Sequence, residues 1–182
     1  MQNTAINTLG YTGIVTISQC IGKEKIEIAQ IHNTGGTALF NFLADCLLGD
    51  FELAAKSRPT KIMLLERKTS TDTSQSVEYI SSSGFIHLLT KPEKIYSNTE
   101  GKVRYSFRIS RDMLESTNKP NAIALYTKDI KDTFVDITNW AAIVENVGDY
   151  LQAAQITASA LIVDWELIIS NKNTNSNASD EE

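Results

Sequence analysis

The sequence contains few of the residues from which compact chemical sites are built. Its 182 residues include two cysteines and two histidines. Cys20 and Cys46 share no C-x-x-C spacing, and neither His32 nor His87 has a carboxylate or cysteine at a metal-ligand spacing. A zinc site normally needs four ligands, or three plus water, so we expect no metal. We expect the cysteines to be small buried apolar residues and not a disulfide.

Positive charge is also scarce. The 17 basic side chains are outnumbered by 22 acidic ones, which gives a net charge of -5 with no visible basic patch. Because proteins hold a nucleic-acid backbone through such a patch, we expect no direct nucleic-acid ligand. No stretch reaches the roughly 18 apolar residues of a membrane span, and no secretory signal is recognisable. We therefore expect a protein that folds in a cytosol and has no membrane span.

The sequence is rich in patterns typical of strands. Residues 102–110 and 160–171 alternate apolar and polar side chains, as in strands with one face in water. Residues 13–20 and 23–31 are two β-rich runs whose connection through Gly22 predicts a hairpin. Three further strands are expected at residues 61–67, which should be covered on both faces, and at 77–81 and 84–89.

One helix is predicted. From Thr37, apolar residues recur at helical spacing, so Leu39, Leu43 and Leu47 should pack on a sheet, and Gly49 should end the helix. The fold class expected is mainly β, an antiparallel β-sandwich with one amphipathic α-helix near residues 37–48. Residues 1–170 should form this single domain. Within it, residues 146–160 are interpreted as an Ala-rich link, and residues 171–182 should form a disordered polar, acidic tail.

The stretch between the second strand and the helix, "HNTGGTALF", invites comparison with phosphate-binding loops. A P-loop requires G-x-x-x-x-G-K-[ST], and this stretch has no lysine at that place. We interpret Gly35 and Gly36 as a structural turn and Thr37 as the helix N-cap. Anion binding by the exposed amides of the helix N-terminus stays open as the alternative.

No pattern in the sequence predicts a catalytic centre or a cofactor. The serines lack a G-x-S-x-G elbow, which would expose a nucleophile. Asp129, Asp132 and Asp136 lie close together but lack the calcium-loop pattern, so a solvated acidic loop is favoured over a calcium site. We therefore expect a protein that is not an enzyme and holds no cofactor.

Aromatic residues in or near the predicted loops are candidate contact points. Trp165 shares a strand face with large aliphatic residues and is expected in the core. Exposed aromatic side chains are favoured anchors in protein interfaces, and they can also form sugar-binding platforms. The candidate interface residues are Trp140, Tyr126, Tyr150 and Tyr96.

Two regions resemble segments of virion structural proteins of tailed bacteriophages. Residues 31–65 are similar to a pattern H-N-x-G-x-x-A-L-F followed by an apolar helix and a buried strand. In residues 120–130 and 161–170, a short apolar strand precedes an alternating strand with a central tryptophan. Small neck, collar and tail proteins of podophages, including crAss-like phages, look similar. The resemblance implies an assembly component of the virion, made in the host cytoplasm, with identical subunits in a ring and other virion proteins as partners.

Two other functions compete with this interpretation. A carbohydrate- or receptor-binding β-sandwich would use several exposed coplanar aromatic side chains. A hydrolase assembled from distant residues would place His32 within hydrogen-bond reach of a nucleophile.

Overall fold

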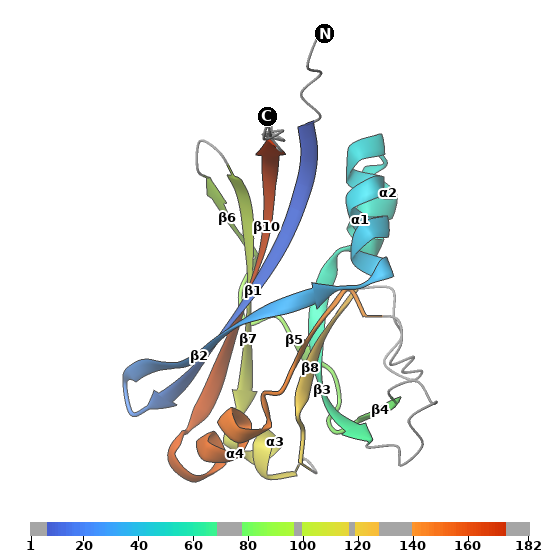
Figure 1. Cartoon of the computed structure of the whole chain (residues 1–182). Helices are drawn as coiled ribbons and strands as arrows, with labels where there is room; N and C mark the ends of the chain where they lie inside the picture. Colours follow the sequence, from blue (N-terminus) through green and yellow to red (C-terminus); the bar gives the residue numbers. More distant parts are fainter. Residues whose placement is uncertain (1–6, 69–77, 97–99, 117–118, 128–139, 174–182) are drawn as a thin grey trace, which may run out of the picture.

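The computed structural model describes residues 7–68, 78–96, 100–116, 119–127 and 140–173, and it is mainly β (Figure 1). All paired strands are antiparallel, and two sheets face each other, which confirms the expected fold class. The candidate calcium residues Asp129, Asp132 and Asp136 lie outside the described residues.

The first sheet, sheet A, contains the longest strands. Its order is β2-β1-β10-β7-β6. The predicted hairpin forms its first pair and turns at Gly22, whose φ of 60° suits glycine. In spatial order the strands are β2 (Glu24–Gly35), β1 (Asn7–Ile21), β10 (Ala160–Asn173), β7 (Glu100–Ser110) and β6 (Glu93–Tyr96).

The second sheet, sheet B, is joined to the first through β2. The end of β2 pairs with β9, where Thr34 and Gly35 lie opposite Ile143 and Ala142. On the other side of the sandwich, a single bridge links Leu88 to Phe107 of β7. The strands of sheet B are β9 (Ala142–Glu145), β8 (Ala122–Thr127), β3 (Pro59–Lys68), β4 (Glu78–Ser81) and β5 (Ile86–His87), the last paired with β3.

The described residues contain four helices where the sequence predicted one. The expected helix is α1 (Thr37–Leu48), and α2 (Phe51–Ser57) and α3 (Arg111–Ser116) are short additions. Helix α4 (Gly148–Thr157) lies within residues 146–160, so the interpretation of that segment as a link was wrong. Helices α1 and α2 form a hairpin at the upper right in Figure 1, while α3 and α4 lie at the lower end. None of the helices in the described ranges is long and apolar enough to cross a membrane.

The main core lies between the two sheets. The predicted alternation is confirmed in β7 and β10, whose inward residues Phe107, Ile109, Val163 and Trp165 are fully buried. A second apolar cluster covers the other face of sheet B, so β3 is buried on both faces as predicted. This second cluster contains Met63, Leu65, Tyr79, Ala122, Ala124, Tyr126 and Ile143, with Phe85 and Trp140 packed against it.

Several residues that were expected to be buried are half-buried or exposed. Cys20 is half-buried and Cys46 is exposed, so neither thiol fills the core. Burial in α1 is concentrated in its first turns, where Leu39 is fully buried, while Leu43 is only half-buried and Leu47 is exposed. The strands of sheet B end below the α1–α2 hairpin and do not cover the far end of α1, which explains the loss of burial along the helix (Figure 1).

The start of the predicted tail belongs to β10. The strand runs to Asn173, and residues 171–173 pair with the start of β1. The rest of the predicted tail, residues 174–182, lies outside the described residues, so its disorder stays a prediction.

Candidate functional site

The outer face of sheet A carries a polar cleft. Its volume is about 380 Å³, and strands β1, β2, β7 and β10 all contribute to it. The alternation that buries one face of these strands necessarily places their polar residues together on the other. The cleft is lined by Thr16, Ser18, Lys25, Glu27, Gln30, Arg104, Asp164 and Glu166.

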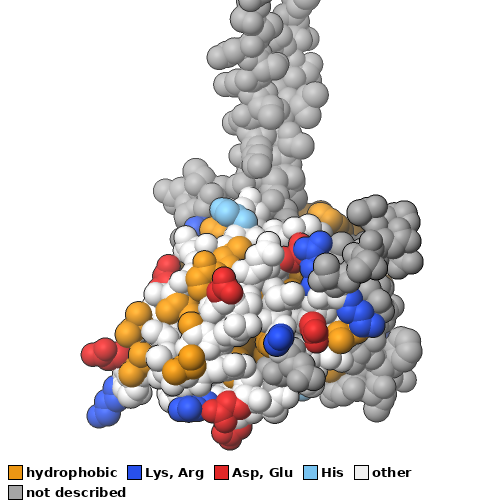
Figure 2. All heavy atoms as spheres, turned by 60° about the horizontal axis from the view of Figure 1, so that its bottom comes forward, with side chains coloured by type: hydrophobic (Ala, Val, Ile, Leu, Met, Phe, Trp, Pro, Cys, Tyr) orange, Lys and Arg blue, Asp and Glu red, His pale blue; other side chains and the backbone are white. Residues whose placement is uncertain are grey.

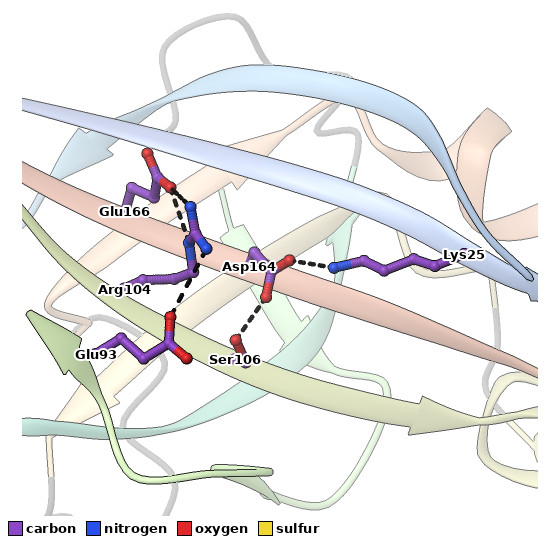
Figure 3. Close-up of polar contacts among 6 residues, drawn as sticks. All are labelled: Lys25, Glu93, Arg104, Ser106, Asp164 and Glu166. Carbon is purple, nitrogen blue, oxygen red and sulfur yellow. Dashed lines mark hydrogen bonds and ion pairs between the residues drawn. The ribbon is translucent and has the colours of Figure 1, made fainter. Parts of the chain in front are cut away.

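Two carboxylates of β10 are fixed by basic partners in this cleft (Figure 3). Lys25 Nζ lies 2.6 Å from Asp164 Oδ2, and Ser106 Oγ donates to Asp164 Oδ1 at 2.6 Å. Arg104 donates from Nε and Nη2 to Glu166 Oε1 at 2.9 and 2.6 Å. Both carboxylates are thus charge-paired in this structure.

Strand register explains these pairs. Asp164 lies opposite Ser106 of β7, and Glu166 lies opposite Arg104 of the same strand. Arg104 Nη1 also lies 3.8 Å from Glu93 Oε2 of the neighbouring strand β6. The hydrogen bonds to Glu166 raise the pKa of Arg104 above its usual value, against the opposing effect of burial. The resulting ladder of charges ties β6, β7, β10 and β2 together.

Both cations of the cleft are paired with carboxylates. Lys25 is paired with Asp164 and Arg104 with Glu166. Glu27 adds a third carboxylate, so the lining has one more acidic than basic side chain, beside hydroxyl and amide groups such as those of Ser18 and Gln30. A neutral, polar ligand fits this lining better than a strongly charged one, since each cation already has an anion beside it. The strand patterns predict these residues on solvent-facing sides, but they do not indicate which strands are neighbours, so the site was not predicted.

No hydrogen bond among the described residues joins either histidine to a nucleophilic side chain. His32 sits on β2 opposite Ile14, and its side chain makes no hydrogen bond to another described residue. His87 is exposed on β5 opposite Lys61. A search of the described ranges for three or more His, Cys, Asp or Glu side chains placed to hold a metal ion finds none.

The four candidate interface aromatics are not brought together. Tyr126 is fully buried, with its ring 5.4 Å from that of Phe85, so its assignment to an interface was wrong. Trp140 is half-buried and meets Tyr79 edge to face at 5.6 Å. Tyr150 is exposed on α4, and Tyr96 ends β6 opposite Gly101. A coplanar sugar-binding platform therefore does not form from Trp140, Tyr126 and Tyr150.

The two glycines predicted as a turn are extended, and the helix cap was misassigned. Gly35 ends β2, Gly36 is the N-cap of α1, and Thr37 is the first helical residue. The Gly36 N–H donates to the carbonyl of Ala141 at 2.7 Å. A side chain at Gly36 would collide with Trp140, which explains the glycine. Because the Gly36 N–H is already hydrogen-bonded to Ala141, one fewer N–H group is available at this helix N-terminus for the alternative role of binding an anion.

The end of the α1–α2 hairpin presents exposed leucines. Leu47, Leu48 and Leu53 are 78%, 83% and 48% exposed, and we call these three residues the upper face. The sequence signal for this surface was present, because α1 is apolar on nearly all sides and not only along one stripe. The pattern predicted a helix correctly, and the third leucine of its expected buried face lies instead in water.

The hairpin is held in a defined shape despite this exposure. Gly49 adopts a left-handed conformation with φ 74°, and its N–H donates to the carbonyl oxygen of Cys46. Gly49 thereby caps the C-terminal end of α1. Asp50 Oδ1 accepts the N–H of Leu53 at 3.0 Å and caps α2. Ser57 Oγ donates to Asp45 at 2.9 Å and ties the two helices together. The hairpin that carries the upper face is therefore ordered by its own hydrogen bonds.

Comparison with protein-family models, curated proteins and solved structures finds no match for this chain.

Proposed function

We propose that this chain is a non-enzymatic structural component of a tailed-phage particle, in the neck, collar or tail. It would act through contacts with identical subunits and with other virion proteins, without a cofactor. Its location would be the virion, after assembly in the host cytoplasm. The observation that carries the proposal is the upper face, and the phage-like patterns in residues 31–65 and 161–170 supply the biological setting.

The leucines of the upper face leave apolar area in contact with water. Burying an exposed leucine side chain contributes about 1.5–3 kcal/mol, and the upper face offers three such side chains close together. Exposed apolar patches of a few hundred Å² often mark interaction sites. Hydrogen bonds cap α2 and join the two helices of the hairpin that presents them, so association would cost little entropy of ordering.

Sedimentation of the full chain at micromolar concentration tests this proposal. We expect species larger than the 20.1 kDa chain, alone or after addition of candidate neck and tail proteins from the same phage. The His32→Gln variant should assemble in the same way, because His32 is given no chemical role. A 20.1 kDa species under every condition would overturn the proposal.

A carbohydrate- or receptor-binding module is the second candidate, and the polar cleft is the observation that favours it. Its hydroxyl, amide and ion-paired groups suit a polyhydroxylated ligand. Calorimetry with neutral oligosaccharides tests this alternative, with Glu166→Gln as the variant that disturbs the cleft. Heat of binding that is lost in the variant would place this function first.

A further inference from the structure

A second group of exposed apolar residues lies at the opposite end of the molecule from the upper face. Ile21 and Ile26 flank the turn between β1 and β2 and are each 40% exposed, while Ile156 near the end of α4 is 79% exposed. We call these three residues the lower face. Figure 1 places the β1–β2 turn and α4 at the lower end, and Figure 2 shows hydrophobic side chains gathered on that end.

Hydrogen bonds join the elements of the lower face. Ile26 lies opposite Gln19, whose side chain accepts from Thr157 at 3.2 Å. Ser159 donates from both its backbone N–H and its Oγ to the carbonyl of Cys20. The C-terminal end of α4 is thus fastened beside the β1–β2 hairpin, and its exposed Ile156 belongs to the same end of the molecule as Ile21 and Ile26.

We propose that the upper face of one copy of this chain docks onto the lower face of a second copy. The inference rests on the proposed function, because it names the subunit contact through which the chain would assemble. A single chain cannot bring its two ends together, whereas two copies placed head to tail can. Each contact leaves one upper and one lower face unused, so the same contact can repeat along a ring or a chain.

Charge disfavours the alternative contact, between two upper faces. Asp50 and Glu52 lie beside the exposed leucines, and the last turn of α1 contains no basic residue to balance the negative end of its dipole. At the lower face, Lys23 is balanced by Glu24 next in sequence, and Lys25 is paired with Asp164, so no excess of negative charge there opposes the acidic upper face. Two upper faces placed together would instead bring their acidic residues into proximity.

Two exposed positions allow a complementation test. Leu48→Asp disables the upper face, and Ile156→Asp disables the lower face; both side chains are in water, so circular dichroism should show unchanged folding. We expect each substitution to weaken self-association by roughly 30-fold or more, as loss of a central interface side chain does. Leu89→Asp is the matched control, because Leu89 is 49% exposed but belongs to neither face.

Mixing the two variants gives the decisive measurement. In a head-to-tail contact, the intact lower face of Leu48→Asp meets the intact upper face of Ile156→Asp. Native mass spectrometry should then show a dimer with one chain of each variant and nothing larger. Each variant alone should stay monomeric, and Leu89→Asp should assemble like the unsubstituted chain.

The other possible outcomes distinguish a failure of the head-to-tail contact from a failure of the proposed function. If Ile156→Asp still dimerises while Leu48→Asp does not, the contact joins two upper faces and the head-to-tail inference is overturned. Assembly that neither substitution changes overturns this inference and leaves the proposed function standing. If the unsubstituted chain never assembles, with or without other virion proteins, both are overturned.

Discussion

Gly36 lies where β2 passes into α1, directly against the backbone of Trp140. A Cβ at this position would overlap the carbonyl oxygen of Trp140 and lie 2.7 Å from its Cδ1. The φ of Gly36 is -105°, which any residue can adopt, so the requirement for glycine here is space and not conformation. The stretch that resembled a phosphate loop in sequence thus serves to bring β2, α1 and Trp140 close together.

Gly36→Ala should therefore destabilise the protein by about 1–3 kcal/mol, as overpacking does. Urea unfolding followed by circular dichroism measures this loss. Gly84→Ala is the control, because a Cβ there meets no described atom within 4 Å. Equal stability of the two variants would contradict the close approach of Trp140.

Tyr79 should titrate far above an ordinary tyrosine. Burial, followed by its hydrogen bond to Glu145 and the charge of that carboxylate, raises its pKa to about 12, although Arg67 acts in the opposite direction. An unfolded tyrosine has a pKa near 10, so the neutral phenol of Tyr79 contributes stability that is fully present below about pH 10. That contribution is lost as the pH rises from about 10 towards 12.

Spectroscopic titration checks this expectation. The ultraviolet absorbance of tyrosinate should include a component near pH 12 that disappears in Tyr79→Phe. The same variant should lose about 1.5–3 kcal/mol at neutral pH, the usual worth of a hydrogen bond to a charged group. Titration of all tyrosines near pH 10 would contradict the buried contact with Glu145.

At the scale of elements, α1 divides into an anchored and an exposed part. Leu39→Ala removes a fully buried side chain from the main core and should cost about 2–5 kcal/mol. Leu47→Ala changes an exposed side chain of the same helix and should alter stability by less than about 0.5 kcal/mol. Urea unfolding at a concentration where the chain is monomeric compares the two. Equal losses would show that the outer half of α1 is covered.

Elements with strong local patterns were predictable, and weakly patterned ones were not. The alternation in residues 102–110 and 160–171 indicates strands with one buried face. The strands β7 and β10 were therefore expected. Helix α4 buries only Leu151 and Ala154, and alanine carries little hydrophobic signal in a pattern. Its helical state depends on packing at the lower end of the sandwich, which local sequence does not encode.

The candidate surfaces were harder to predict than the elements that carry them. Arg104 and Glu166 are 62 residues apart, and their pairing depends on the register between β7 and β10. The upper face depends on where the sheet stops beneath α1. Both features are set by long-range arrangement, whereas Gly36 and the β1–β2 turn were visible because their signals are local.

At the scale of the whole molecule, the two apolar clusters share their strands. Leu64 and Leu125 face the main core, while their neighbours Met63 and Ala124 face the second cluster. Strands β3 and β8 therefore cannot leave one cluster without leaving the other. Strand β2 adds a further link, because it pairs with β1 in one sheet and with β9 in the other.

This sharing predicts that the described part of the chain unfolds as one cooperative unit. The two tryptophans are suitable reporters, since Trp165 lies in the main core and Trp140 packs against the second cluster. In Trp140→Phe the fluorescence reports the main core, and in Trp165→Phe it reports the second cluster. Each fluorescence transition in urea should coincide with the far-ultraviolet circular dichroism of the same variant.

Trp165→Phe is suited to this use because the indole N–H of Trp165 has no hydrogen-bond partner among the described residues, so only ring volume is lost. A Trp140 signal that changes at lower urea than the circular dichroism would show that the second cluster opens on its own.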